Sequence, residues 1–384
     1  MKVYLDHAAT TPMLPEIIEK MMPYLNERFG NASSLHLYGE EAKQALEQSR
    51  ETIAKLLNAE SDEIYFTSGG TESDNIAIIG SARESDKKQI MTSNIEHEAV
   101  IEPIRYLEKE YGYKADYLRV DEYGIVDLNL LERIINPGTL LVSVMMANNE
   151  IGTIEPIKDI VRMAKRYDVL VHTDAVQAVG KMKIDVKELG VDMLSASAHK
   201  FYGPKGIGFI YIKRGTPVSN IIFGGGHERG MRSGTENVPG AVGMAAALKY
   251  CYEKFDTLEE KYVGWKEKIL SACEDIGDYK LNGHPTNRLV STLSLAFKGV
   301  NGESLMQALS MNGIAVSTGS ACSSHSSHRD VSRILRAIGL SEDFAQGTIR
   351  VVTGADNTDE QIDYFIQNLY QIIKKLRKMG ECTS

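Results

Sequence analysis

The stretch Ser195–Gly208 carries a lysine in a position suited to covalent chemistry. An apolar run typical of a strand ends at Ser197, and His199 and Lys200 follow before a turn rich in glycine and proline. In open α/β sheets, ligands bind beyond the carboxyl ends of the strands. A lysine at such a place could form a Schiff base with a carbonyl cofactor. A surface lysine beside a tight turn would give the same pattern.

A buried carboxylate is the second candidate. Asp174 ends the apolar run Val169–Thr173, where a carboxylate is costly to bury without a positive partner. A protonated pyridine nitrogen would be such a partner, and an aspartate there makes pyridoxal phosphate a better electron sink. Gln177 could reach the same ligand. The alternative is that Asp174 caps a following helix.

Two glycine-rich segments could bind an anion. In Thr67–Asn75 (TSGGTESDN) a strand meets glycines and then a helix start, whose bare backbone amides suit a phosphate. Such turns are common between strands and helices, so the motif alone does not identify the ligand. Phe223–Thr235 (FGGGHERGMRSGT) could bind phosphate or form a loop between subunits.

Cysteine chemistry is expected at one position. Cys322 lies in the polar segment Ser317–Ser324 (STGSACSS), within a stretch that we expect to be a mobile loop. An exposed loop thiol near cations can become a reactive thiolate. Cys251 and Cys273 lie in helical apolar stripes and are expected to be small core residues, whereas Cys382 has no expected role.

His325 and His328 follow Cys322 with the spacing C-x-x-H-x-x-H. Three ligands on one loop make a poor closed metal site, so no permanent metal is expected. The histidines are expected to be solvated or to modulate the thiolate.

The elements that must position these residues alternate in type. From about residue 60, short apolar runs alternate with segments of helical periodicity, which predicts an α/β fold with helices on both faces of a sheet. The run Thr139–Ala147 suits a strand buried on both faces. The other expected strands are Glu63–Thr67, Gln89–Ser93, Ala115–Val120, Val169–Val176, Asp192–Ala198 and Gly206–Lys213.

The pattern changes after about residue 240. Long helical segments at Ala241–Phe255 and Leu258–Ile276 lead into separate strands and helices, which end in the amphipathic segment Asp359–Met379. We therefore expect a large domain over residues 14–258. A smaller α+β domain is expected from residues 1–13 and 259–384.

Composition excludes some classes of function. The 384 residues carry a formal net charge of -9, which disfavours nucleic-acid binding as the main role. The first residues contain no apolar signal segment, and the longest apolar run, Leu140–Ala147, is too short to span a bilayer. Four widely spaced cysteines disfavour a disulfide framework. A cytoplasmic protein that does not associate with membranes is expected.

Ten ordered motifs resemble those of the cysteine desulfurases of the NifS/IscS class. They are YLDHAATT, GNASSLH, TSGGTESDN, IEHEAV, NNEIGT, HTDAVQAVGK, SAHKFYGPKGIG, GGGHERGMRSGTENVPG, TGSACSS and AQGTIRVV. The resemblance implies a fold-type I, aminotransferase-like enzyme dependent on pyridoxal phosphate. It also implies a homodimer, a large domain with a mainly parallel seven-stranded sheet, and a smaller C-terminal domain.

The resemblance implies cofactor-binding roles for residues of several motifs, namely Gly70, Thr71, His97, Asp174, Gln177, Ser197, His199, Lys200 and Thr235. Lys200 would form the Schiff base, and His97 would stack on the ring and help in proton transfer. Asp174 would pair with the ring nitrogen and Gln177 with the phenolic oxygen. The other residues would hold the phosphate, with Thr235 coming from the partner subunit.

Substrate and nucleophile are implied in the same way. Asn149 and Arg350 would bind L-cysteine, with Arg350 as a fork on its carboxylate. Cys322 would attack the substrate sulfur, which leaves alanine and a persulfide on the enzyme. A sulfur-acceptor protein such as an iron–sulfur scaffold would then receive the sulfur, and Cys322 would at most be a transient iron–sulfur ligand. The resemblance implies that a scaffold would dock on a longer C-terminal tail, whereas Ser384 here follows soon after the amphipathic segment. The identity of the scaffold therefore stays open.

Three other functions remain open. An aminotransferase on the same fold would leave TGSACSS unexplained, whereas a selenocysteine lyase would use the same residues. A non-catalytic sulfur carrier would be expected to lack Lys200 or Cys322, and the chain has both.

Overall fold

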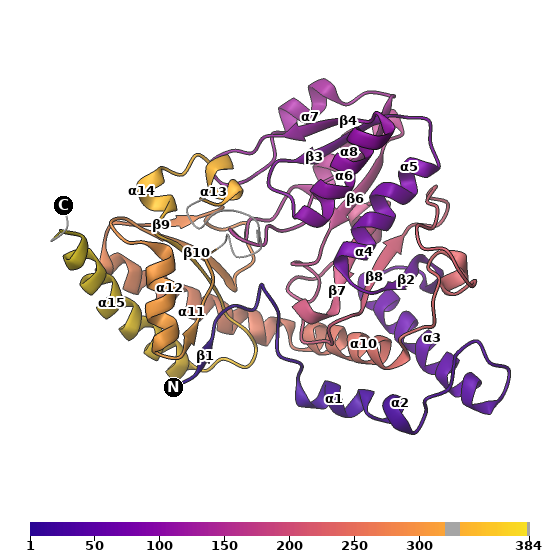
Figure 1. The fold of residues 1–384 in the computed structure, drawn as a ribbon, viewed down its shortest axis with the longest axis horizontal. Coiled ribbons are helices and arrows are strands. Elements are labelled where there is room, and N and C mark those ends of the chain that lie inside the picture. Colours follow the sequence, from indigo (N-terminus) through magenta and orange to yellow (C-terminus); the bar gives the residue numbers. More distant parts are fainter. Residues whose placement is uncertain (319–330, 382–384) are drawn as a thin grey trace.

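The computed structural model describes residues 1–318 and 331–381. Figure 1 shows two lobes, one built on a large sheet and one on a small sheet. The predicted loop with Cys322, His325 and His328 lies outside the described residues apart from Ser317 and Thr318, and so does Cys382. None of the helices within the described ranges is long and apolar enough to cross a membrane.

The large sheet has seven strands in the order β2-β8-β7-β6-β5-β3-β4. Its strands are β2 (Ile64–Thr67), β3 (Gln89–Ser93), β4 (Lys114–Leu118), β5 (Thr139–Ser143), β6 (Leu170–Asp174), β7 (Met193–Ser197) and β8 (Gly208–Ile212). The pairs from β7 to β4 are parallel, and β8 runs antiparallel to both of its neighbours. The mainly parallel seven-stranded sheet implied by the resemblance is therefore confirmed.

Both faces of this sheet are covered, because successive side chains of its strands enter different cores. Leu194 and Phe209 join one core. That core also contains residues of α3 (Leu37–Leu57), α7 (Leu128–Ile134), α8 (Ile157–Ala164) and α10 (Val238–Glu253). Met193 and Ile210 join the opposite core, with α6 (Glu98–Tyr111), α5 (Ser81–Arg83) and the π-helical turn Ile76–Gly80. The sheet is thus a buried layer whose strand ends can hold a site.

The small sheet is antiparallel, in the order β12-β10-β9. It contains β9 (Tyr279–Asn282), β10 (Thr292–Phe297) and β12 (Thr348–Val352). Its core includes side chains of α11 (Phe255–Ile276), α12 (Gly302–Met311) and α15 (Asp359–Glu381). Beside this lobe (Figure 1), β1 (Val3–Tyr4) pairs in parallel with β11 (Ile314–Ala315).

The remaining helices are short. They are α1 (Pro15–Met21), α2 (Pro23–Asn26), α4 (Gly70–Asn75), α9 (Val186–Leu189), α13 (Arg333–Ala337) and α14 (Glu342–Ala345).

Two predicted elements differ in detail from the structure. The apolar run Thr139–Ala147 is a strand only to Ser143, because its last residue, Ala147, turns to pair with Ile154. The helix whose start is predicted within Thr67–Asn75 begins as α4 and continues as the π-helical turn and α5. Cys251 and Cys273 are buried core residues, as expected.

Candidate active site

A cavity of about 270 Å³ lies at the carboxyl ends of β6 and β7. Asp174 ends β6 and Ser197 ends β7, and both side chains line the cavity. Most of the predicted site residues line it together, namely Gly70, Thr71, His97, Asn149, Asp174, Gln177, Ser197, His199, Lys200 and Arg350. These residues come from both lobes, since Arg350 lies in β12.

Lys200 is held at the cavity by the N-terminal segment. It ends a short 3-10 turn after β7, and its Nζ donates to the carbonyl oxygens of Ala8 (2.7 Å) and Ala9 (2.8 Å). The carbonyl of His199 in turn accepts from the backbone N–H and hydroxyl of Thr11. Lys200 is thus not a solvated surface lysine beside a turn.

Asp174 is buried, and its carboxylate accepts from the Val176 N–H at 2.9 Å. Burial raises the pKa of Asp174, while that hydrogen bond and the nearby His97 and Lys200 lower it. No helix follows directly, so the helix-cap alternative is wrong. A cationic ring nitrogen in the cavity would favour the charged carboxylate.

Part of the cavity wall suits an anion. Gly70 begins α4 and lies close to Val176. A Cβ built at Gly70 would lie 2.5 Å from Val176 Cγ2, so a larger residue would collide with that side chain. Thr71, Ser197 and His199 add side chains able to donate hydrogen bonds. Burial, together with the nearby lysines Lys200, Lys205 and Lys181, lowers the pKa of His199 to about 4.

Arg350 and Asn149 close the side that faces the small sheet. Arg350 is buried and donates to Asp6 Oδ1 (2.8 Å) and to the Asn149 carbonyl (2.9 Å). Its Nε and the side-chain oxygen of Asn149 are buried without a hydrogen-bond partner. Unpaired buried polar atoms are costly, which indicates that a polar ligand completes this wall.

The segment that carries Cys322 is attached beside this wall. Ser317 pairs with Arg350, with Ser317 N to Arg350 O at 3.1 Å and Arg350 N to Ser317 O at 2.6 Å. After residues 319–330, Ser332 donates to Glu150 Oε2 at 2.6 Å. Both ends of the segment are therefore fixed next to residues of the cavity.

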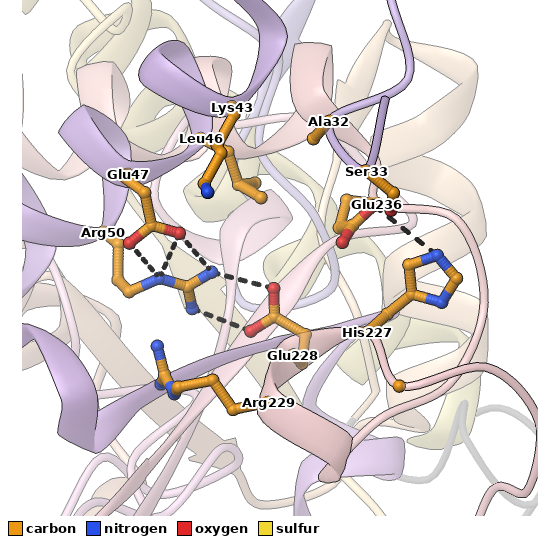
Figure 2. A pocket seen from close by; sticks show the side chains of 11 residues that line it. Ala32, Ser33, Lys43, Leu46, Glu47, Arg50, His227, Glu228, Arg229 and Glu236 are labelled. Carbon is orange, nitrogen blue, oxygen red and sulfur yellow. Dashed lines mark hydrogen bonds and ion pairs between the residues drawn. The ribbon is translucent and has the colours of Figure 1, made fainter. Parts of the chain in front are cut away.

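Thr235 is the one predicted cofactor residue among the described residues that does not line this cavity; its side chain is exposed. Its expected role was in the partner subunit's site, so a single chain leaves that role a prediction. The glycine-rich loop before it lines a separate cavity of about 480 Å³ (Figure 2), together with α3. Arg50 of α3 there binds Glu228 of the loop through two hydrogen bonds of 2.7 and 2.9 Å.

Sequence reasoning missed three polar groups at or beside the cavity. Asp74 lines it, with Oδ1 lying 3.5 Å from His172 Nε2. Burial raises the pKa of Asp74 well above its usual range and lowers that of His172 to about 3. Lys181 donates to Gln177 Oε1 at 2.9 Å. Asp74 and Lys181 both lie inside motifs quoted above, but nothing in their local pattern shows what they contact.

The residues present fit pyridoxal phosphate. The cavity combines an amine, a buried carboxylate for a ring nitrogen, an amide, an imidazole and a glycine-lined anion wall. Among residues 1–318 and 331–381, no cluster of His, Cys, Asp and Glu could hold a metal ion.

Comparisons with known proteins agree with the resemblance. Residues 3–365 match the class V aminotransferase family. The chain is 47% identical to a cysteine desulfurase IscS of Clostridium botulinum, over 99% of this chain and 96% of that protein. It is 48% identical to a cysteine desulfurase IscS of Dictyoglomus turgidum, with the same coverage.

Solved structures are similar over most of the chain. A NifS-like protein superposes with a TM-score of 0.91 at 39% identity, covering 97% of this chain and all of that one. SspA, whose structure was solved in complex with cysteine, superposes with a TM-score of 0.81 at 34% identity. That match covers 91% of this chain and 98% of the other.

Proposed function

Because the chain belongs to the class V aminotransferases, and within them to the cysteine desulfurases, we propose that it takes sulfur from L-cysteine and holds it as a persulfide on Cys322. The products are L-alanine and the persulfide, so the sulfur acceptor of the first half-reaction is the enzyme thiol itself. The observation that carries the proposal is the single cavity at the strand ends, which gathers Lys200, Asp174, His97 and Arg350.

The residues of the cavity divide the binding work between them. Gly70, Thr71, Ser197 and His199 would hold the phosphate, with Thr235 of a second copy. Asp174 would pair with the ring nitrogen, Gln177 would bond the phenolic oxygen, and His97 would lie on the ring face. Pyridoxal phosphate, when bound, supplies the sink for the electron pair released at the substrate Cα.

The chain's own groups would carry the remaining chemistry. Arg350, with Asn149, would bind the carboxylate of L-cysteine and fix the orientation of its Cα–H bond. Lys200 would take that proton and later return one to the carbon skeleton, with His97 assisting. The Cys322 thiolate would attack the substrate sulfur as the carbon–sulfur bond breaks, so the sulfur stays on the enzyme.

The domain division at residues 14–258 against 1–13 and 259–384 fits this proposal. It would place Lys200 and Asp174 in the large domain and Arg350 and Cys322 in the small one. The cavity would then lie where the two domains meet.

We further propose a cytoplasmic homodimer that passes its sulfur to an acceptor protein such as an iron–sulfur scaffold. Several large apolar side chains are exposed near α3 and the glycine-rich loop, which supports a covering partner there. They are Phe29 (67% exposed), Leu35 (97%), Leu37 (67%) and Phe223 (70%). The name IscS of the relatives supports an iron–sulfur role.

The test is release of alanine and sulfide from L-cysteine in the presence of a thiol reductant. The unmodified enzyme should make both, whereas Cys322→Ala should keep its cofactor absorbance and make neither. Lys200→Ala should lose the covalent cofactor linkage and the activity together. A Cys322→Ala variant as active as the unmodified enzyme would refute the persulfide mechanism.

A further inference from the structure

Gln177 is held by two contacts that fix the orientation of its amide. Nε2 donates to the carbonyl oxygen of Ala8 at 3.0 Å, and Oε1 accepts from Lys181 Nζ at 2.9 Å. A carbonyl can only accept and a lysine amine donates, so both contacts require the same assignment of the amide nitrogen and oxygen. The second N–H of Nε2 is left over, on a side chain that lines the cavity.

We propose that Lys181 is a positioning residue, which orients the Gln177 amide so that it presents an N–H donor to the bound cofactor. The inference rests on the proposed function, because it assumes that the cavity holds pyridoxal phosphate. Without Lys181, a flipped amide would present its oxygen to the cavity and turn an acceptor toward the phenolic oxygen. Lys181 therefore acts together with the Ala8 carbonyl in setting which end of Gln177 the cofactor meets.

Lys181 is well placed for this role. Its side chain is half-buried and lines a small cavity of about 20 Å³ behind the active site. Burial, together with the nearby cations Lys200 and Arg350, lowers the pKa of Lys181 to about 7. The amine has an N–H to donate in either protonation state.

The arrangement links Lys181 to the reactive lysine through Gln177. The Ala8 carbonyl accepts from both Gln177 Nε2 and Lys200 Nζ, and Lys181 is linked to this carbonyl through its hydrogen bond to Gln177 Oε1. The titratable groups around Lys181 are Lys200 and Arg350 on the active-site side and His7, Tyr202, Cys251, Glu259 and Tyr262 around the small cavity. The charge of Lys181 itself would act on the cofactor whether or not Gln177 is present, whereas its effect on the amide orientation needs Gln177.

A double-mutant cycle separates the effect of the Lys181 charge on the cofactor from its effect on the orientation of the Gln177 amide. The pH titration of cofactor absorbance is measured for the holoenzyme and for Lys181→Met, Gln177→Leu and the double variant. Losing an N–H donor to the phenolic oxygen disfavours the deprotonated chromophore. Lys181→Met is therefore expected to raise the chromophore pKa by roughly 0.5 to 1 unit, the value of one ordinary hydrogen bond. In the Gln177→Leu background, Lys181→Met should shift the chromophore pKa by less than about 0.2 unit, because there is then no Gln177 amide for Lys181 to orient.

Two further variants serve as controls. Lys181→Arg keeps a donor and should restore the original titration. Lys183→Met removes a nearby exposed lysine, which pairs with Asp256, and should leave the titration unchanged. If Lys181→Met does not fold, Lys181→Gln, which keeps an N–H donor but no charge, is expected to match the unmodified enzyme within about 0.2 unit by the same coupling argument.

A shift that persists in the Gln177→Leu background would overturn the proposal, because Lys181 would then act as a charge alone. No shift in either background would overturn it as well. The readout needs no turnover of L-cysteine, so loss of the proposed desulfurase activity and failure of the Lys181 effect are separate results.

Discussion

The cavity at the strand ends and the cavity beside α3 are both lined by acidic, basic and histidine side chains, but these groups are paired to different extents. In the cavity beside α3, of about 480 Å³, Arg50 is bound by Glu228 and Glu47, and Glu236 lies 3.9 Å from His227 (Figure 2). The Phe66 N–H also donates to Glu228, at 2.8 Å.

The cavity at the strand ends has a volume of about 270 Å³ and leaves more of its polar atoms unpaired. Asp74 Oδ1, Asn149 Oδ1 and Arg350 Nε are buried there without hydrogen-bond partners, whereas Glu236 Oε2 is the one such atom beside α3 among the described residues. The larger cavity therefore has charged groups that pair with one another and stabilise the fold, and the smaller one has buried polar atoms that a bound ligand would pair with. Volume alone would have pointed to the wrong one.

The largest effect is expected from breaking the ion pair beside α3. Glu228→Ala leaves Arg50, which is only 2% exposed, without its buried carboxylate partner and paired only with Glu47, whose side chain is 44% exposed. The free energy of unfolding should fall by about 3–5 kcal/mol. Urea unfolding, followed by circular dichroism, measures it.

Glu47→Ala is the matched control, since Glu47 binds the same arginine from a side chain that is 44% exposed. It should cost less than about 1 kcal/mol. Equal costs for the two variants would mean that Glu228 contributes no more than a surface partner.

Asp174→Asn should lower activity without lowering stability, which is the reverse of what is expected for Glu228→Ala. Removing the carboxylate that would pair with the ring nitrogen is expected to lower kcat about 10²–10³-fold, as for other single groups that stabilise transition-state charge. Burial raises the pKa of Asp174, so the carboxylate is costly to the fold. The cofactor-free variant should thus be at least as stable as the unmodified protein. Alanine release and urea unfolding measure the two effects, and a variant that loses stability but keeps kcat would reverse the assignment.

The sequence predicted the smaller cavity better than the larger one, and the reason is physical. Lys200, Asp174 and Gly70 lie at strand ends and at a strand-to-helix turn, where parallel topology gathers residues from separate motifs. The apolar runs that mark those strands agree with the structure within one or two residues for most of the sheet, because a strand buried on both faces needs a continuous apolar run.

The ion pair of Arg50 and Glu228 could not have been predicted in this way. Its partners are 178 residues apart and neither lies in a pattern that indicates a partner. The contact of Lys181 with Gln177 was hidden for a different reason. A spacing of four residues indicates contact only within a helix, and the segment between them forms turns. Cys322 lies outside the described residues, so its position relative to the cavity stays a prediction.

Arg350→Lys should change substrate binding more than stability. Lysine cannot reproduce the planar fork on a carboxylate, so KM for L-cysteine is expected to rise about 10-fold. Steady-state kinetics at saturating cofactor measures it. Arg377→Lys is the control, because Arg377 also bonds backbone carbonyls but lies on α15. A rise in KM for both variants would point to a general loosening of the small lobe.

The smallest effect is expected from Glu96, a buried carboxyl beside the active-site cavity that does not line it. It accepts the Met145 N–H with both oxygens, and burial raises its pKa from 4.5 to about 8. Between those values the unfolded chain releases a proton that the folded protein keeps, so stability falls as pH rises through this window. One pH unit is worth at most about 1.4 kcal/mol for one group.

Glu96→Gln removes this titration. The difference in unfolding free energy between the variant and the unmodified protein should therefore shift in favour of the variant by about 1 kcal/mol per unit between pH 5.5 and 7.5. Urea unfolding at three pH values measures the slope, and Glu98→Gln, at an exposed neighbouring carboxylate, should show none. Parallel pH profiles for Glu96→Gln and the unmodified protein would mean that Glu96 is charged when folded. The carboxyls around the site would then be paired as fully as those beside α3, and the contrast between the two cavities would fail.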